Sequence, residues 1–98
     1  MNDIKKMTNW YLDSTIERMK GAVDFATLTL LPKGTKRAIE FAVRSIREVF
    51  EQANGVLLFN LVYADAITEE EQQEFYRKLY EAKLYWEDRA LEIGEVKA

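Results

Sequence analysis

The feature that most constrains the fold of this chain is the apolar run VLLFNLVYA at residues 56–64. In a helix this run has apolar side chains on every side, and such a helix has to be covered all round. The chain has 98 residues, the length of one domain, and a domain of this size buries only about two-thirds of its unfolded surface. One copy therefore has little material to cover the run. The run indicates a partner, most simply a second copy of the chain.

Apolar residues recur with the period of an α-helix through three parts of the chain. We expect an all-α bundle of three long helices, at about 3–29, 35–65 and 68–93, forming a single domain over residues 1–98. The connections between these helices are short, so neighbouring helices are expected to run antiparallel. The sequence thus predicts a small helical bundle, dimeric because of the apolar run.

Turn and capping residues mark the expected helix boundaries. Pro32 disfavours helical geometry in the residue before it, and Gly34 tolerates almost any turn, so the first break is expected there. Thr35 is the expected N-cap of the second helix. Thr68 and Glu71 have the spacing of a capping box and predict the start of the third helix.

The pair Asn54-Gly55 leaves two alternatives for the second helix. Such a pair usually signals a turn, which would give a hairpin of two shorter helices. The apolar residues keep their phase across the pair, which favours one long helix with a weak point. Asn60, on the apolar side of this helix, can fix an oligomeric register by pairing with itself. The alternatives for Asn60 are a kink or a bond to a nearby carbonyl group.

The second and third helices each carry apolar residues outside the stripe that a three-helix core needs. Such surplus surface is typical of a helical homodimer or of a protein that binds a larger partner, and aromatic residues are favoured in interfaces. We therefore expect a small, non-enzymatic protein-interaction protein: an adaptor, an inhibitor or a regulatory protein. The residues expected in the partner interface are Val56, Phe59, Asn60, Tyr63, Tyr76, Tyr80 and Leu84.

The net charge of −3 is unevenly divided along the chain. Residues 1–50 hold 9 Lys/Arg and 6 Asp/Glu (+3), whereas residues 51–98 hold 5 Lys/Arg and 11 Asp/Glu (−6). A basic stripe on the second helix supports an alternative function, a nucleic-acid-associated regulatory protein. Glu40 and Glu51 in the same sector dilute the stripe, so the sequence favours a solvated face. The possible phosphate contacts are Lys33, Lys36, Arg37, Arg44 and Arg47.

The chain contains no His and no Cys. These are the usual general base and the commonest zinc ligands, so we predict no catalytic residue, no metal site, no cofactor and no enzymatic activity. A third function rests on Glu70-Glu71-x-x-Glu74, which resembles the first half of the EExxE motif of all-helical MazG-like nucleotide pyrophosphohydrolases. This resemblance implies Mg²⁺-dependent nucleotide hydrolysis. The second acidic pair of that family, ExxD, has no counterpart in the later acids, and the pattern favours acids that cap the helix start.

The N-terminal residues are not followed by the apolar core of a signal peptide. The longest apolar stretch is also shorter than the ~20 residues that a membrane-spanning helix needs. We expect a cytoplasmic protein without a membrane segment, in the style of a small bacterial or phage accessory protein.

Overall fold

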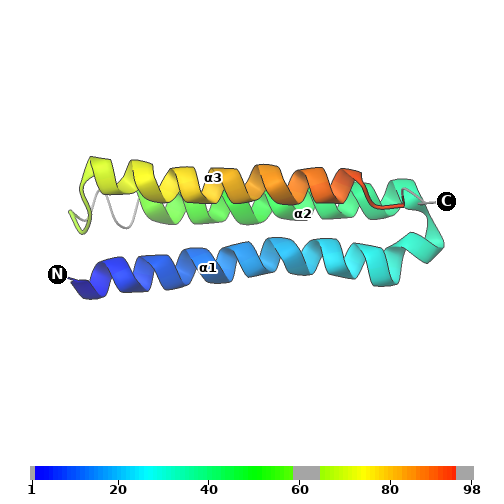
Figure 1. Ribbon diagram of the computed structural model, residues 1–98, viewed down its shortest axis with the longest axis horizontal. Coiled ribbons are helices and arrows are strands. Elements are labelled where there is room, and N and C mark those ends of the chain that lie inside the picture. Colours follow the sequence, from blue (N-terminus) through cyan, green and yellow to red (C-terminus); the bar gives the residue numbers. More distant parts are fainter. Residues whose placement is uncertain (1, 59–64, 95–98) are drawn as a thin grey trace.

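The computed structural model describes residues 2–58 and 65–94, which form one elongated bundle of 51 × 21 × 17 Å (Figure 1). Its main helices are α1 (Asn2–Phe25), α2 (Thr35–Gly55) and α3 (Glu69–Leu91), each packed against the other two. The expected all-α bundle of three helices is therefore confirmed. None of the helices in the described segments is long and apolar enough to cross a membrane.

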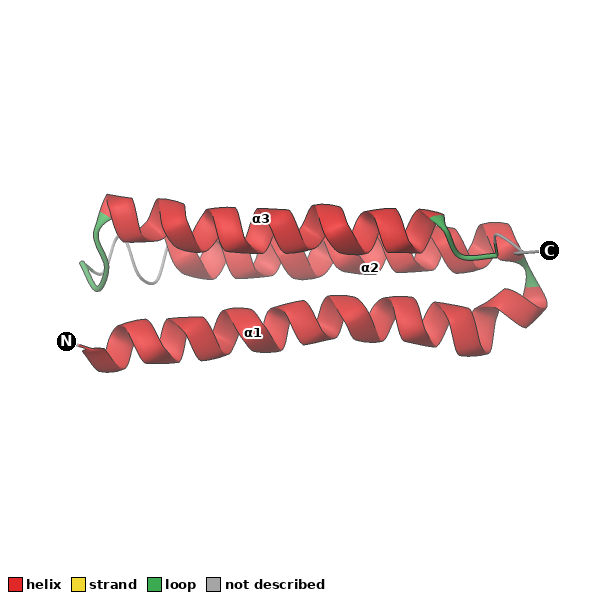
Figure 2. Cartoon of the chain, in the orientation of Figure 1, coloured by secondary structure: helices red, strands yellow, loops and turns green. Residues whose placement is uncertain are grey.

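The chain turns between α1 and α2 through two short helical elements, at the end of the bundle far from the N-terminus (Figure 2). The first is the π-helical turn η1 (Ala26–Leu30), and the second is the 3₁₀ turn η2 (Leu31–Lys33). Pro32 stands in the first positions of η2, where its missing N–H leaves no hydrogen bond unmade. The α-helix thus ends earlier than residue 29, but the helical path continues past the proline.

Gly34, not Thr35, caps the start of α2, so the expected cap was wrong. Gly34 has φ 156° and ψ 124°, a conformation that residues with a side chain rarely adopt. Thr35 becomes the first residue of the helix. The turn after α3 lies against this connection at Gly94 (φ 84°), where an added methyl group would lie 2.5 Å from Thr35 Cγ2 and 3.2 Å from Leu31 Cδ1.

Asn54 and Gly55 both lie inside α2, which contradicts a hairpin at this pair. Val56 keeps right-handed helical angles (φ −62°, ψ −45°), and the backbone continues to residue 58 as a π-helical turn. Residues 59–64 lie outside the described residues, so a helix end near residue 65 stays a prediction, and Asp65 itself has φ 61° in the turn that leads to α3. Asp is one of the few residues that tolerates this left-handed conformation.

The capping box at the start of α3 is present as expected. The Glu71 backbone N–H donates to Thr68 Oγ1 (3.1 Å), and the Thr68 N–H donates to Glu71 Oε1 (2.9 Å). Glu71 also pairs with Lys5 Nζ at 2.6 Å, which connects the first turn of α3 to α1. The Lys5 ammonium and the Thr68 N–H together lower the pKa of Glu71 from its ordinary value of 4.5. In turn, the Glu71 carboxylate raises the pKa of Lys5 from 10.5.

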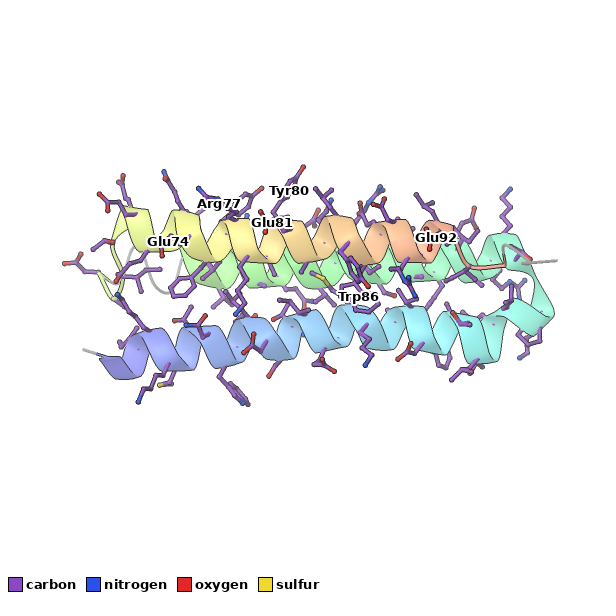
Figure 3. All side chains as sticks on the ribbon, viewed as in Figure 1. Glu74, Arg77, Tyr80, Glu81, Trp86 and Glu92 are labelled. Carbon is purple, nitrogen blue, oxygen red and sulfur yellow. The ribbon has the colours of Figure 1, made fainter. Side chains whose placement is uncertain are left out.

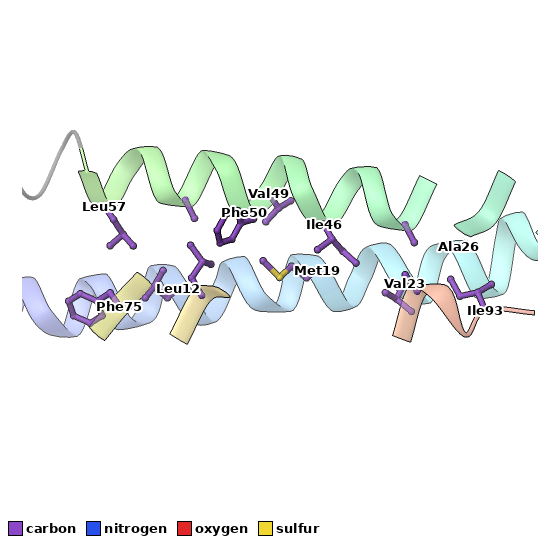
Figure 4. Close-up of a cluster of buried hydrophobic side chains, with 14 of the residues drawn as sticks. Leu12, Met19, Val23, Ala26, Ile46, Val49, Phe50, Leu57, Phe75 and Ile93 are labelled. Atoms are coloured by element: carbon purple, nitrogen blue, oxygen red, sulfur yellow. The ribbon is translucent and has the colours of Figure 1, made fainter. Parts of the chain in front are cut away.

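The core is a single apolar layer to which all three helices contribute one face (Figure 4). Thr8 and Thr15 are also buried, and their hydroxyls donate to the carbonyls of Ile4 (2.8 Å) and Tyr11 (2.9 Å). Within the described segments, no buried side-chain polar atom lacks a partner. The buried apolar residues are Leu12, Met19, Val23, Ala26, Ala38, Ala42, Ile46, Val49, Phe50, Ala53, Leu57, Ile67, Phe75, Leu79, Ala90 and Ile93.

Truncating the core should be far more costly than truncating the surface. Leu79 is fully buried, so Leu79→Ala should lower the free energy of unfolding by about 2–5 kcal/mol. Leu28 is 78% exposed, so the matched change Leu28→Ala should alter it by less than about 0.5 kcal/mol. Urea unfolding followed by circular dichroism measures both values. Equal effects would show that Leu79 is not in the core.

The contact between Glu71 and Lys5 should make stability depend on pH. The lowered pKa of Glu71 means that its contribution is present above 4.5 and is lost as pH falls through the folded-state value. The raised pKa of Lys5 means that its contribution is present below 10.5 and is lost as pH rises through the folded-state value. Glu71→Gln keeps a capping residue but removes the charge.

Wild type should therefore be more stable than Glu71→Gln at neutral pH, and the difference should vanish in strong acid. Urea unfolding at a series of pH values measures this difference. Glu17→Gln, at an exposed position of α1, is the matched control and should show no such trend. A difference between wild type and Glu71→Gln that stays constant into strong acid would contradict the ion pair.

Candidate functional site

One side of the bundle, formed by α2 and α3, carries apolar residues that the core does not cover. Tyr80, Leu84 and Leu91 of α3 are 39%, 43% and 57% exposed. In Figure 3 Tyr80 projects away from α1, whereas Trp86 lies between α3 and α1. We call this surface the α2–α3 face and define it by Ile39, Val43 and Arg47 of α2 with Tyr76, Tyr80, Leu84 and Leu91 of α3.

Two tyrosine rings lie at the centre of the α2–α3 face and pack against the buried ring of Phe50. Tyr76 and Tyr80 are stacked with their centroids 5.8 Å apart, and both meet the edge of Phe50 from α2, at 5.8 and 6.2 Å. Lys83 Nζ lies 5.4 Å from the Phe50 ring and 5.6 Å from the Tyr80 ring. Stacked aromatic rings under a cation lose little conformational freedom on binding, which suits them to contact a partner.

Glu87 joins the two helices beside these rings. Arg47 Nε donates to Glu87 Oε2 at 2.9 Å, and Lys83 Nζ lies 3.3 Å from the same oxygen. The side chains of Glu87 and Lys83 are only 13% and 18% exposed. Two cations therefore share one carboxylate in a partly dehydrated place, where the attraction is screened less than at an open surface.

A wide hollow of about 660 Å³ opens on the outer side of α2. Its apolar part consists of Ile39 and Val43 from α2 with Leu91 from α3. Charges of both signs surround this apolar part, so the hollow suits a partner with complementary charges better than a small neutral molecule. The charged residues that line it are Glu40, Arg44, Arg47, Glu48 and Glu51.

The structure brings together only part of the expected interface. Tyr76, Tyr80 and Leu84 share the α2–α3 face. Val56 is half-buried on the opposite side of α2, in a hollow of about 190 Å³ that it lines with Tyr11 and other residues of α1. The remaining expected interface residues, Phe59, Asn60 and Tyr63, lie outside the described residues.

The five expected phosphate contacts are all exposed, but they do not form one uninterrupted basic surface. Arg47 is bound to Glu87, and Arg44 lines the hollow together with three glutamates. Lys33, Lys36 and Arg37 stand apart from them, in η2 and the first turn of α2. The arrangement gives alternating charge along α2, with its most basic part at the N-terminal end.

The acidic cluster at the start of α3 is divided between different contacts. Glu71 faces α1 and is bound by Lys5, while Glu70 and Glu74 are exposed. In the described part of the chain, no three acidic side chains lie close enough together to hold a metal ion.

Sequence reasoning missed the ionic cluster of the α2–α3 face. Lys83 and Glu87 have the i,i+4 spacing that forms ion pairs on a helix, which was the available signal. Their link to Arg47 depends on how α2 and α3 pack, and spacing within one helix does not report it. Met7 and Trp10, both exposed on α1, form a second apolar surface that lies away from the α2–α3 face.

Comparison with protein-family models, with curated proteins and with solved structures finds no match to this chain.

Removing Glu87 should destabilise the bundle more than removing either of its cations. Glu87→Ala leaves both Lys83 and Arg47 without their carboxylate, whereas Arg47→Ala leaves the Lys83–Glu87 pair intact. The pair is partly buried, so the loss for Glu87→Ala should exceed the ~1 kcal/mol typical of exposed pairs. Urea unfolding of both variants measures the difference. A larger loss for Arg47→Ala would contradict the shared-carboxylate arrangement.

Proposed function

We propose that this chain is a small, non-enzymatic protein-interaction protein, an adaptor, inhibitor or regulatory protein, that acts through the α2–α3 face. It acts as a helical homodimer or by binding a larger partner protein, and neighbouring helices in each bundle run antiparallel. The observation that carries the proposal is the row of exposed apolar residues Tyr80, Leu84 and Leu91 beside the half-buried Ile39 and Val43. A contiguous apolar surface with a charged rim is typical of a protein-binding site.

The charged groups on this face support binding rather than chemistry. Glu87 is already engaged by Arg47 and Lys83, so these groups neutralise one another instead of facing a substrate. The absence of His and Cys from the chain removes the side chains that most often act as general base or nucleophile near neutral pH. A chain without Cys also suits the reducing cytoplasm, where we place this protein.

A nucleic-acid-associated function has weaker support in the arrangement of charges. Of the five basic residues, Arg47 is neutralised by Glu87 and Arg44 stands among acids. Binding through the remaining Lys33, Lys36 and Arg37 would weaken steeply with salt. Salt-sensitive binding of DNA, lost on reversal of Lys36 and Arg37 to Glu, would favour this function over the proposed one.

The proposal predicts that the purified chain is either larger than a monomer of 11.5 kDa or binds a dye specific for exposed apolar surface. The double variant Leu84→Ser, Leu91→Ser removes apolar area from the α2–α3 face. It should therefore weaken self-association, or lower the dye fluorescence of a monomer, by several-fold. Light scattering and dye fluorescence measure the two properties.

The matched control is Met7→Ser with Leu28→Ser, which removes exposed apolar area elsewhere on the bundle and should have little effect. A monomer that binds no dye would contradict the proposed function. Equal effects of the two paired changes would contradict the choice of the α2–α3 face.

A further inference from the structure

We infer that the partner on the α2–α3 face is a second copy of this chain, with α2 of the two copies antiparallel. The two-fold axis lies in the interface, perpendicular to α2, at the level of Arg47 and Glu48. This inference rests on the proposed function and commits it to one partner. It is carried by the order of charges along α2, by the residues beside the axis and by the size of the face.

The outer side of α2 is complementary to itself when reversed. Arg44 and Arg47 precede the proposed axis, and Glu48 and Glu51 follow it at matching intervals. Reversal about the axis therefore places Arg44 of each copy opposite Glu51 of the other. All four residues line the same open hollow, so they share one accessible side of the helix. In a two-fold interface each such contact is made twice.

Apolar residues of α3 lie at the level of the axis, and apolar residues are favoured at the centre of an interface. The Arg47–Glu87 hydrogen bond and the contact of Phe50 with Tyr80 show that this part of α2 lies alongside residues 80–87 of α3. Leu84 lies within that stretch and is 43% exposed. An axis at this level brings Tyr80 and Leu84 of the two copies together.

The face is large enough for a stable dimer. The bundle is 51 Å long, and α3 lies in front of α2 in the view down the shortest axis of 17 Å, so the α2–α3 face extends along these two directions (Figure 1). A standard interface takes roughly 800 Å² from each partner, which is comparable with the outline of such a face. Arg44 and Glu51 are roughly 10 Å apart along one helix at ~1.5 Å per residue, so they do not pair with each other within one copy.

Charge reversal at these two positions tests the inference. Arg44→Glu sets two carboxylates against each other in both copies of this contact, and Glu51→Arg sets two guanidinium groups against each other. Each variant alone should dimerise at least roughly tenfold more weakly than wild type, because like charges are brought together. Sedimentation equilibrium measures the dissociation constants.

Mixing the two variants gives the decisive result. In a mixed dimer both contacts join opposite charges, so the two weak variants should associate with each other about as tightly as wild type does with itself. The double variant carrying both changes should regain self-association for the same reason. Labelling one variant with a donor dye and the other with an acceptor reports the mixed dimer directly.

Two controls separate assembly from folding. Glu17→Lys reverses an exposed charge on α1 and should leave the dissociation constant unchanged. Circular dichroism of each variant at low concentration should show wild-type helix content. A mixed dimer formed from two folded, weakly associating variants cannot result from a folding defect.

A wild-type chain that is monomeric at high concentration would overturn the inference, and dye binding by that monomer would leave the proposed function standing. A dimer that neither single change weakens, or variants that do not associate when mixed, would also overturn it. A two-fold axis parallel to the helices would set α2 against α3 of the other copy. Association in such a dimer would not depend on the contact between Arg44 and Glu51, so the variants would show the results that overturn the inference.

Discussion

The structure depends on the close approach of helix backbones along the inner side of α2. Ala38, Ala42 and Ala53 are fully buried there, and small side chains let the neighbouring helices come near. Ile46, between Ala42 and Ala53 in the sequence, and Leu57, just after α2, are fully buried as well. The contacts that result are short-range, so the helices are held along one narrow layer, and each helix contributes only one face to it.

Exposed apolar residues follow from this narrow layer. A third helix of ordinary composition would place polar residues on the side that the layer leaves free. Here α3 instead places Tyr80, Leu84 and Leu91 on that side, where they are 39%, 43% and 57% exposed. We assign these three residues to an interface because their apolar side chains are exposed to solvent.

Local sequence signals predicted what depends on local interactions. The helical period identified the three helices, and the capping box located the start of α3, because its hydrogen bonds join residues three apart. The end of α1 was missed because the helix passes into a π-helical turn, where packing rather than composition decides the hydrogen-bond pattern. Periodicity also could not tell which neighbour lies on which side of a helix, so Val56 was grouped with Tyr76 although Val56 lies against α1.

The two ends of the bundle are closed by different forces. At one end the turn at Gly94 rests on Thr35 and Leu31 through van der Waals contact, which is insensitive to salt and acid. At the other end α1 meets α3 through the ion pair of Lys5 and Glu71, which salt screens and acid neutralises, as well as through the packing of Ile4 on the core. The N-terminal turns of α1 are therefore held more weakly as ionic strength rises, whereas the contact at Gly94 is unaffected. Amide hydrogen exchange along α1 would then be graded, fastest at its beginning, with a gradient that steepens as ionic strength rises.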